Sequence, residues 1–247
     1  MEIAKITREV FKQIISTKPL VVMPVGSIEQ HGPHCPLGTD SLIAEGVAQE
    51  ACRRTETLCA PTIFIALSEH HKGFPGTLWV SRQTFFNYLI DISKSLVHQG
   101  VEKLIFVNGH GGNTAILTDL CSELRAQLNV VSLVFQWWAP PTDLQRIFKA
   151  EGVHADGVET SMMAAIDAEL VDMKAFEQVN PKDVPSEWSR KIGDSTLPLY
   201  THEFSSTGIA GALDVYSIEK GREVKEAAIQ RLSKVIHELL EFEFLEK

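Results

Sequence analysis

The chain has 247 residues, of which 44% are apolar and 22% charged, the proportions of a globular protein that can bury a sizeable core. Its 32 acidic and 23 basic residues give a net charge of −9, and no segment is basic enough to follow a phosphate backbone. We therefore expect no nucleic-acid partner. With no apolar run of about 18 residues, no membrane span is expected either. The cysteines form no CxxC pair and no apolar leader is visible, which favours a cytoplasmic location.

Strand and helix patterns alternate through the first half of the chain. Four short apolar, β-branched runs predict buried strands at residues 20–25, 62–67, 104–107 and 130–135. Helical patterns lie between them at residues 40–54, 81–100 and 113–128, and the second of these has Ser81 as its N-cap and stops at Gly100. This alternation predicts an α/β fold with a mostly parallel central sheet and helices on both faces. We expect a single domain over residues 1–247.

The second half of the chain is less regular. Trp137 and Trp138 precede two prolines, which predicts a loop with exposed or half-exposed aromatic rings. A helix is expected at residues 157–169. Residues 180–211 are rich in Pro, Ser, Thr and Gly and predict a long loop of the kind that forms lids or interfaces. A final amphipathic helix is predicted from apolar residues whose simplest role is core packing; these are Val224, Ala228, Leu232, Val235 and Leu239.

Six of the nine histidines fall in four short clusters that also contain carboxylates. The clusters are residues 29–40, 69–71, 108–113 and 154–159. Ligand sites of parallel α/β sheets gather beyond the carboxyl ends of the strands, and two of the clusters directly follow predicted strands. Carboxylate and imidazole groups together are the ligands of borderline divalent metals, so the clusters predict a dinuclear metal site.

Glu29 and His31 are two residues apart, which places their side chains on the same side of an extended segment. Asp40 is the candidate bridge between two ions. His31 and His110 would complete one metal site, and Glu29 would belong to the other. Taken alone, Asp40 is equally well explained as an N-cap and His31 as a hydrogen-bonded structural histidine.

The glycine-rich loop around His110 permits close backbone approach, although a phosphate cradle at a helix N-terminus is an alternative. His154 and Glu159 lie on either side of a helix start, where one would carry protons and the other ligate a metal. The alternative for Glu159 taken alone is a favourable interaction with the helix dipole. Ser68 and His71 follow a predicted strand and are expected to line the substrate pocket, with a surface histidine as the alternative for His71.

Four motifs resemble the creatininase (creatinine amidohydrolase) family, in the same order along residues 20–165. They are PVGSIEQHGPH with LGTD at residues 24–40, FPGT at 74–77, NGHGGN at 108–113 and HADGVETS at 154–161. The resemblance implies a cytoplasmic α/β amidohydrolase with two divalent ions per subunit (Zn, Mn or Fe), assembled as a homohexamer. Because the family also contains formamide deformylases, a peptide-trimming maturase and a sugar-ketone ring hydrolase, the resemblance implies these activities as alternatives.

The resemblance places Glu29, His31, Asp40 and His110 on family metal ligands, and His154 with Glu159 on residues for catalysis, ligation or substrate handling. The sequence departs from true creatininases at two glycines. Gly112 replaces a glutamate ligand, so that either Glu159 or water completes the second metal site. Gly111 replaces a tyrosine and would line the substrate pocket.

These features predict a dinuclear metal-dependent amidohydrolase that cleaves a C–N bond of a small amide or cyclic amide. The expected cofactors are two divalent metal ions per subunit. A deformylase, peptide-trimming or ring-hydrolase activity is an alternative within the family. A nucleotide- or phosphate-binding module and a non-catalytic scaffold are the alternatives of another class.

Overall fold

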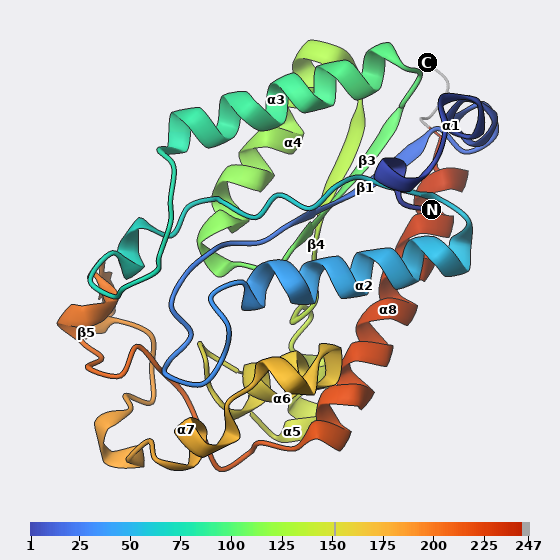
Figure 1. The fold of residues 1–247 in the computed structure, drawn as a ribbon. Coiled ribbons are helices and arrows are strands. Elements are labelled where there is room, and N and C mark those ends of the chain that lie inside the picture. Colours follow the sequence, from blue (N-terminus) through green and yellow to red (C-terminus); the bar gives the residue numbers. More distant parts are fainter. Residues whose placement is uncertain (151, 244–247) are drawn as a thin grey trace.

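The computed structural model describes residues 1–150 and 152–243 and has the α/β architecture that the sequence predicts (Figure 1). Four parallel strands form the central sheet in the order β2-β1-β3-β4. Their bounds are Leu20–Val25 for β1, Leu58–Cys59 for β2, Lys103–Asn108 for β3 and Val131–Gln136 for β4. In the register of the sheet, Val21 pairs with Leu104 of β3 and Leu58 of β2.

Both faces of the sheet are buried. Alternate residues of β1 and β3 point to opposite sides of the sheet, and each set packs into a hydrophobic cluster. Leu20 and Val22 pack into one hydrophobic cluster, whereas Val21 and Met23 pack into another. Helices of the first cluster are α2 (Thr39–Thr55), α5 (Thr142–Phe148), α6 (Gly157–Ile166) and α8 (Ile218–Glu241). Helices of the second are α1 (Arg8–Ile15), α3 (Arg82–His98) and α4 (Thr114–Leu128). Figure 1 shows α3 and α4 on one side of the sheet and α2 and α8 on the other.

The predicted helices are confirmed with small changes of boundary. The side chain of Ser81 caps α3 by accepting from the backbone N–H of Thr84, and α6 ends at Ile166, just before a 3-10 turn. The amphipathic pattern near the C-terminus is α8, in which Val224, Ala228 and Leu232 are buried.

The strand predicted at residues 62–67 is wrong. This segment makes only two isolated bridges, Val25 with Ile63 and Ala66 with Trp79, and the edge strand β2 lies earlier in the chain. After Ile63 the backbone leaves β1, and the apolar run does not join the sheet: Phe64 and Ile65 are exposed, whereas Ala66 and Leu67 are buried.

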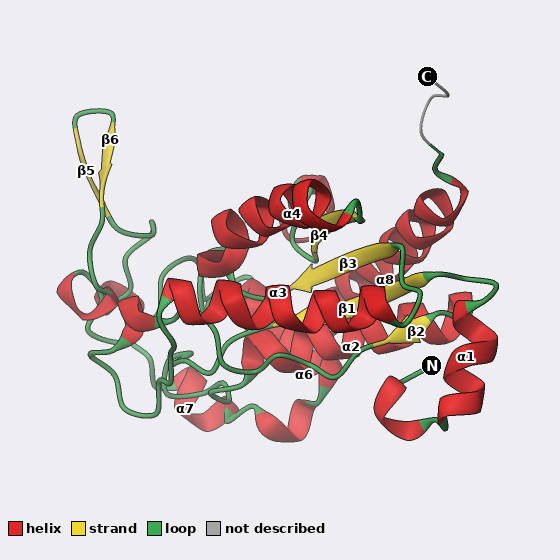
Figure 2. Ribbon diagram, turned by 90° about the horizontal axis from the view of Figure 1, so that it is seen from above, coloured by secondary structure: helices red, strands yellow, loops and turns green. Residues whose placement is uncertain are grey.

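Residues 180–211 contain more structure than the predicted loop. Two short strands, β5 (Arg190–Ile192) and β6 (Ser195–Leu197), pair as an antiparallel hairpin that projects from the body of the molecule (Figure 2). The remaining helix is α7 (Met173–Glu177). Short 3-10 helices are η1 (Ile3–Lys5), η2 (Glu69–His71), η3 (Gly111–Asn113), η4 (Ala168–Leu170), η5 (Pro181–Asp183) and η6 (Thr201–Glu203). Among the described residues, no helix is both long and apolar enough to cross a bilayer.

Candidate metal centre and active site

The histidine and carboxylate clusters meet at the carboxyl ends of β1 and β3, the edge at which parallel α/β sheets bind ligands. Asp40 lies in the first turn of α2, whose N-cap is Gly38, so the alternative of Asp40 as the N-cap is wrong. The loop after β3 approaches α2 closely at Gly109, where a Cβ atom would lie 2.1 Å from the backbone oxygen of Asp40. Only glycine allows this approach, and it brings His110 to Asp40.

The two carboxylate oxygens of Asp40 face different histidines. Its Oδ1 lies 3.1 Å from His31 Nε2, and its Oδ2 lies 3.0 Å from His110 Nδ1. Glu29 Oε2 lies 3.2 Å from the same His110 nitrogen. Glu159 Oε2 lies 3.6 Å from His31 Nε2. These distances place Glu29 near His110 and Glu159 near His31, on the two sides of Asp40. The division of the ligands between two ions stays a prediction.

Three histidines are each fixed by a backbone carbonyl at one ring nitrogen. His31 Nδ1 lies 3.1 Å from the oxygen of Glu29, His110 Nε2 lies 3.1 Å from that of Leu67, and His154 Nε2 lies 3.1 Å from that of Gln30. With the N–H donated to the carbonyl, the other nitrogen of each ring presents its lone pair to the carboxylate cluster. Histidine ligands of metal ions are held in this way.

Glu159 is positioned by the start of α6. Asp156 caps this helix, since its Oδ1 accepts from the backbone N–H groups of Val158 and Glu159 at 3.0 Å. Glu159 Oε2 accepts from the N–H of Ala155 at 2.6 Å. The carboxylate thus points back across the helix start and lies 3.9 Å from His154 Nδ1.

A second layer of side chains supports the cluster. The Gln30 amide donates to His71 Nδ1 at 2.8 Å and to the oxygen of Gly208 at 2.9 Å, which leaves the hydrogen of His71 on Nε2, 3.2 Å from Glu29 Oε1. His71 is fully buried, so the surface alternative for this residue is wrong. The ring of His70 stacks on that of His110, with centroids 5.3 Å apart.

Burial and charge together shift the proton affinities of the cluster. Burial disfavours the charged form of His31, but the Asp40 and Glu159 carboxylates outweigh it and raise the pKa of His31 to about 10. Burial raises the pKa of Glu159 to about 8 against the opposing charge of His31. Burial also holds the pKa of His154 well below its ordinary value. Protons are therefore shared within the cluster when cations are absent.

The donor set fits divalent metal ions. With the hydrogen of His110 on Nε2, Asp40 Oδ2 is buried without a hydrogen-bond partner, an arrangement that is costly unless a cation satisfies it. Among the described residues, none of the Glu29, Asp40 and Glu159 carboxylates pairs with a lysine or arginine. Three groups of ligand atoms lie close enough to share an ion: Glu29, His70 and His110; Glu29, His31 and His154; and His31, Asp40 and Glu159.

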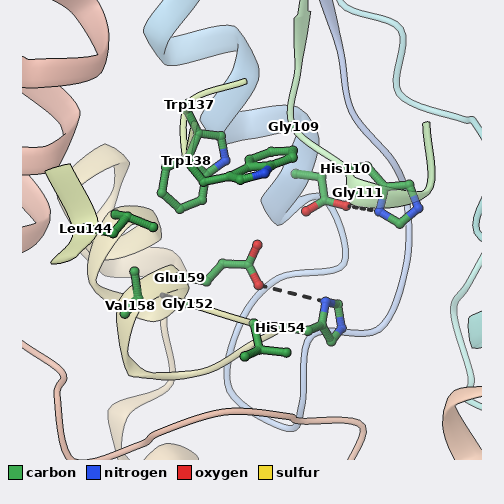
Figure 3. Close-up of a pocket in the computed structure, with 12 residues that line it drawn as sticks. Gly109, His110, Gly111, Trp137, Trp138, Leu144, Gly152, His154, Val158 and Glu159 are labelled. Carbon is green, nitrogen blue, oxygen red and sulfur yellow. Dashed lines mark ion pairs between the residues drawn. The ribbon is translucent and has the colours of Figure 1, made fainter. Parts of the chain in front are cut away.

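Two pockets open onto this centre. The first, called the inner pocket, has a volume of about 150 Å³ and apolar walls that include Trp137, Trp138, Leu144 and Val158. The carboxylate of Glu159 lies between these tryptophans and His154 (Figure 3). The second, called the hairpin pocket, measures about 470 Å³; its walls include Trp188, Thr196, Pro198 and Leu199. Four residues line both pockets, namely His110, Gly111, Val153 and His154.

Some predicted site residues lie differently from expectation. Ser68 is buried and donates to the carbonyl of Leu78 at 2.9 Å, and it does not line either pocket, so its substrate role stays a prediction. Trp137 is buried, contrary to the predicted exposed loop. Sequence reasoning missed Gln30 and Trp188. Only the position of Gln30 between two ligand candidates could have indicated it, and no signal marked Trp188.

The match to the family model described as "Creatininase: Creatinine amidohydrolase" covers residues 4–236. The chain belongs to the creatininase family. It is 26% identical over 246 residues to the 3-dehydro-scyllo-inosose hydrolase of Thermotoga maritima, covering 90% of this chain and 78% of the relative. It is 30% identical over 235 residues to the mycofactocin precursor peptide peptidase of Mycobacterium tuberculosis, covering 88% and 84%. This chain is thus a creatininase-family hydrolase.

Solved creatininase structures share the fold. One crystal structure of creatinine amidohydrolase superposes with a TM-score of 0.83 at 23% identity, covering 98% of both chains. Another creatininase, described as "Zn-Zn type", has the same TM-score at 22% identity, covering 98% of both chains. At such low identity the superposition establishes a common architecture alone. The metal assignment for this chain therefore depends on its own histidine and carboxylate cluster.

Gly112 explains how this chain departs from the expected ligand set. A Cβ atom at Gly112 would lie 2.4 Å from His110 Nε2 and 2.9 Å from the carbonyl oxygen of Leu67. No side chain fits there while His110 keeps its contact with Leu67. At Gly111, by contrast, a Cβ atom would meet nothing within 4 Å. A glutamate ligand two residues after His110 is thus excluded by packing, and Glu159 joins Asp40 as a second carboxylate near His31.

Proposed function

We propose that this chain is a dinuclear metal-dependent amidohydrolase that cleaves a C–N bond of a small amide or cyclic amide. The observation that carries the proposal is the position of Asp40, whose two oxygens face His31 on one side and His110 on the other. One carboxylate placed in this way suits a bridge between two cations. Zn, Mn and Fe all accept such mixed oxygen and nitrogen ligands.

In this proposal Glu29, Asp40 and His110 would hold one ion, and His31, Asp40 and Glu159 would hold the other. Divalent ions bound here would supply Lewis acidity, which lowers the pKa of water and polarises a carbonyl group. The carboxylates provide negative charge that retains the ions, and the backbone carbonyls of Glu29 and Leu67 orient His31 and His110. The apolar walls of the inner pocket exclude bulk water from the reacting group.

His154 is the proposed proton carrier. Its Nε2 is anchored on the carbonyl of Gln30, so its free Nδ1 faces the carboxylates of Glu29 and Glu159 at 3.9 Å. In the overall reaction the water oxygen joins the carbonyl carbon and His154 Nδ1 takes up a proton of that water. The C–N bond breaks as His154 delivers this proton from Nδ1 to the leaving nitrogen. Assembly as a homo-oligomer and a cytoplasmic location stay predictions.

Elemental mass spectrometry on purified, tag-free protein tests the metal site. We expect about two divalent ions per chain, the number the ligand set can satisfy, and their loss in Asp40→Ala. Asp119→Ala, which removes an exposed carboxylate of α4 far from the cluster, should keep both ions. A wild-type protein that takes up no metal after reconstitution would refute the proposal.

A further inference from the structure

The two pockets are unequal and lie on either side of the residues that they share. The inner pocket, at about 150 Å³, is the size of an apolar cavity that admits a benzene-sized group. The hairpin pocket is about three times larger, at about 470 Å³. Both are bordered by His110 and His154, so the crossing from one pocket to the other lies at residues of the proposed active site.

Gly111 leaves this crossing open. It lines both pockets, and a Cβ atom built on it would meet no atom within 4 Å. A side chain at this position would therefore begin without a clash at Cβ, and it would occupy space at the boundary that the two pockets share. The glycine at position 111 leaves the boundary between the two pockets free of a side chain.

The indole ring of Trp188 lines the hairpin pocket. This half-buried ring lies edge-on to His154 and Phe204, with centroid distances of 5.2 and 5.1 Å, and tilted to His71 at 5.4 Å. These contacts hold the indole in place beside the histidines. An ordered indole of this kind is a stacking surface for a flat or apolar group.

The charge around the pockets limits what can bind. Among the described residues that line them, none is a lysine or an arginine, and the hairpin pocket has no carboxylate either. Lys72 and Arg190 each adjoin a lining residue in sequence but line neither pocket: Lys72 lies over the Tyr200 ring and near Glu69, and Arg190 is an exposed residue of β5. Away from the proposed ions, a phosphate or a free carboxylate would therefore lack a basic side chain as its counter-charge, whereas a neutral group would not need one.

We propose that the substrate is an uncharged secondary amide that spans both pockets, with a group no larger than a benzene ring in the inner pocket and a larger neutral group beneath Trp188. The scissile C–N bond would then lie between His110 and His154. This inference rests on the proposed metal-dependent function, and it narrows the substrate from any small amide to one substituted on both sides of the bond.

Titration calorimetry on the metal-loaded protein tests the inference with two hydroxamates, which bind metal ions through two oxygens. Benzohydroxamate carries a ring on one side of that group, and N-benzylbenzohydroxamate carries a ring on both sides. We expect the two-ring compound to bind about tenfold more tightly, because its second ring stacks on Trp188. Trp188→Ala should remove this advantage, whereas Ile192→Ala, at the exposed tip of the same hairpin, should keep it.

Gly111→Leu gives an independent readout if the tryptophan variant folds poorly. Its side chain would narrow the passage, so the ratio of the two affinities should again fall toward one. Equal binding of both hydroxamates by the wild-type protein, or an advantage that survives both substitutions, would overturn the spanning substrate while leaving the metal centre intact. Failure of metal-loaded protein to bind either compound would instead overturn the metal centre and the inference together.

Discussion

The role of single residues is clearest at His154, where Nε2 contacts the carbonyl of Gln30 and Nδ1 is the proposed site of proton transfer. Because Nε2 is fixed by the carbonyl of Gln30, replacing His154 with Ala should remove a proton carrier without removing the ligands of either proposed ion. We expect the metal content to stay at the wild-type level and the turnover of an amide substrate to fall by about 10²–10⁴-fold. Steady-state kinetics with parallel metal analysis provide the measurement. His237→Ala, at an exposed position of α8, is the control. Unchanged turnover in His154→Ala would exclude the proposed role.

The two glycines that follow His110 provide a matched pair. Gly112→Ala should push a methyl group against His110 Nε2 and disturb its contact with the carbonyl of Leu67, whereas Gly111→Ala meets no atom. Loss of such an orienting contact weakens metal affinity by about 10–100-fold. We expect competition with a chelator to extract metal far more readily from Gly112→Ala than from Gly111→Ala. Equal retention in the two variants would contradict this explanation.

At the level of elements, the start of α6 determines where Glu159 points. Asp156 accepts two backbone N–H groups of this helix through Oδ1, and Oδ2 accepts that of Val153 at 3.0 Å. Asp156→Ala should lower the free energy of unfolding by about 0.5–2 kcal/mol, the usual cost of a lost N-cap. Asp156→Asn keeps an oxygen for the cap and should recover most of that loss. Urea unfolding measures both, and an alanine variant as stable as the wild type would argue against the cap.

The elements also show how far the sequence could predict this structure. Strands β1, β3 and β4 were predictable because buried parallel strands are continuous apolar runs, and the ligands were predictable because several clusters occurred together. Residues 62–67 have the same apolar character but form only bridges, since nothing in composition shows where a backbone leaves a sheet. Strand β2, with two residues, is too short to give a periodic signal.

The remaining features that the sequence could not predict concern contacts between distant segments. The hairpin strands have fully exposed residues and therefore no apolar alternation to detect. The division of ligands around Asp40 depends on which oxygen faces which ring, and only the packing of α2 against the loops after β1 and β3 determines this. Burial of Trp137 likewise follows from its packing with α5, α6 and α8 in one cluster.

For the whole molecule, the metal centre joins segments from both halves of the chain, so bound ions should stabilise the entire fold. A ligand at 100 times its Kd adds about 2.7 kcal/mol for one site. In a chain of this size about 1 kcal/mol moves Tm by about 2–4 °C. Removal of the metal by a chelator should therefore lower Tm by roughly 5–10 °C, measured by calorimetry. Asp40→Ala should show no metal-dependent change, and an equal change in that variant would mean that the ions stabilise the protein from another site.

The hairpin β5–β6 and Trp188 are separate in sequence from every proposed metal ligand, although they border the same centre. Residues 188–199 can therefore change in length or composition during evolution while the carboxylates and imidazoles are retained. Exposed hairpin tips are also the places where chains best tolerate insertions. Divergence of this one segment would give a new substrate range to an unchanged metal centre. Such an arrangement would allow one family to contain hydrolases of very different compounds.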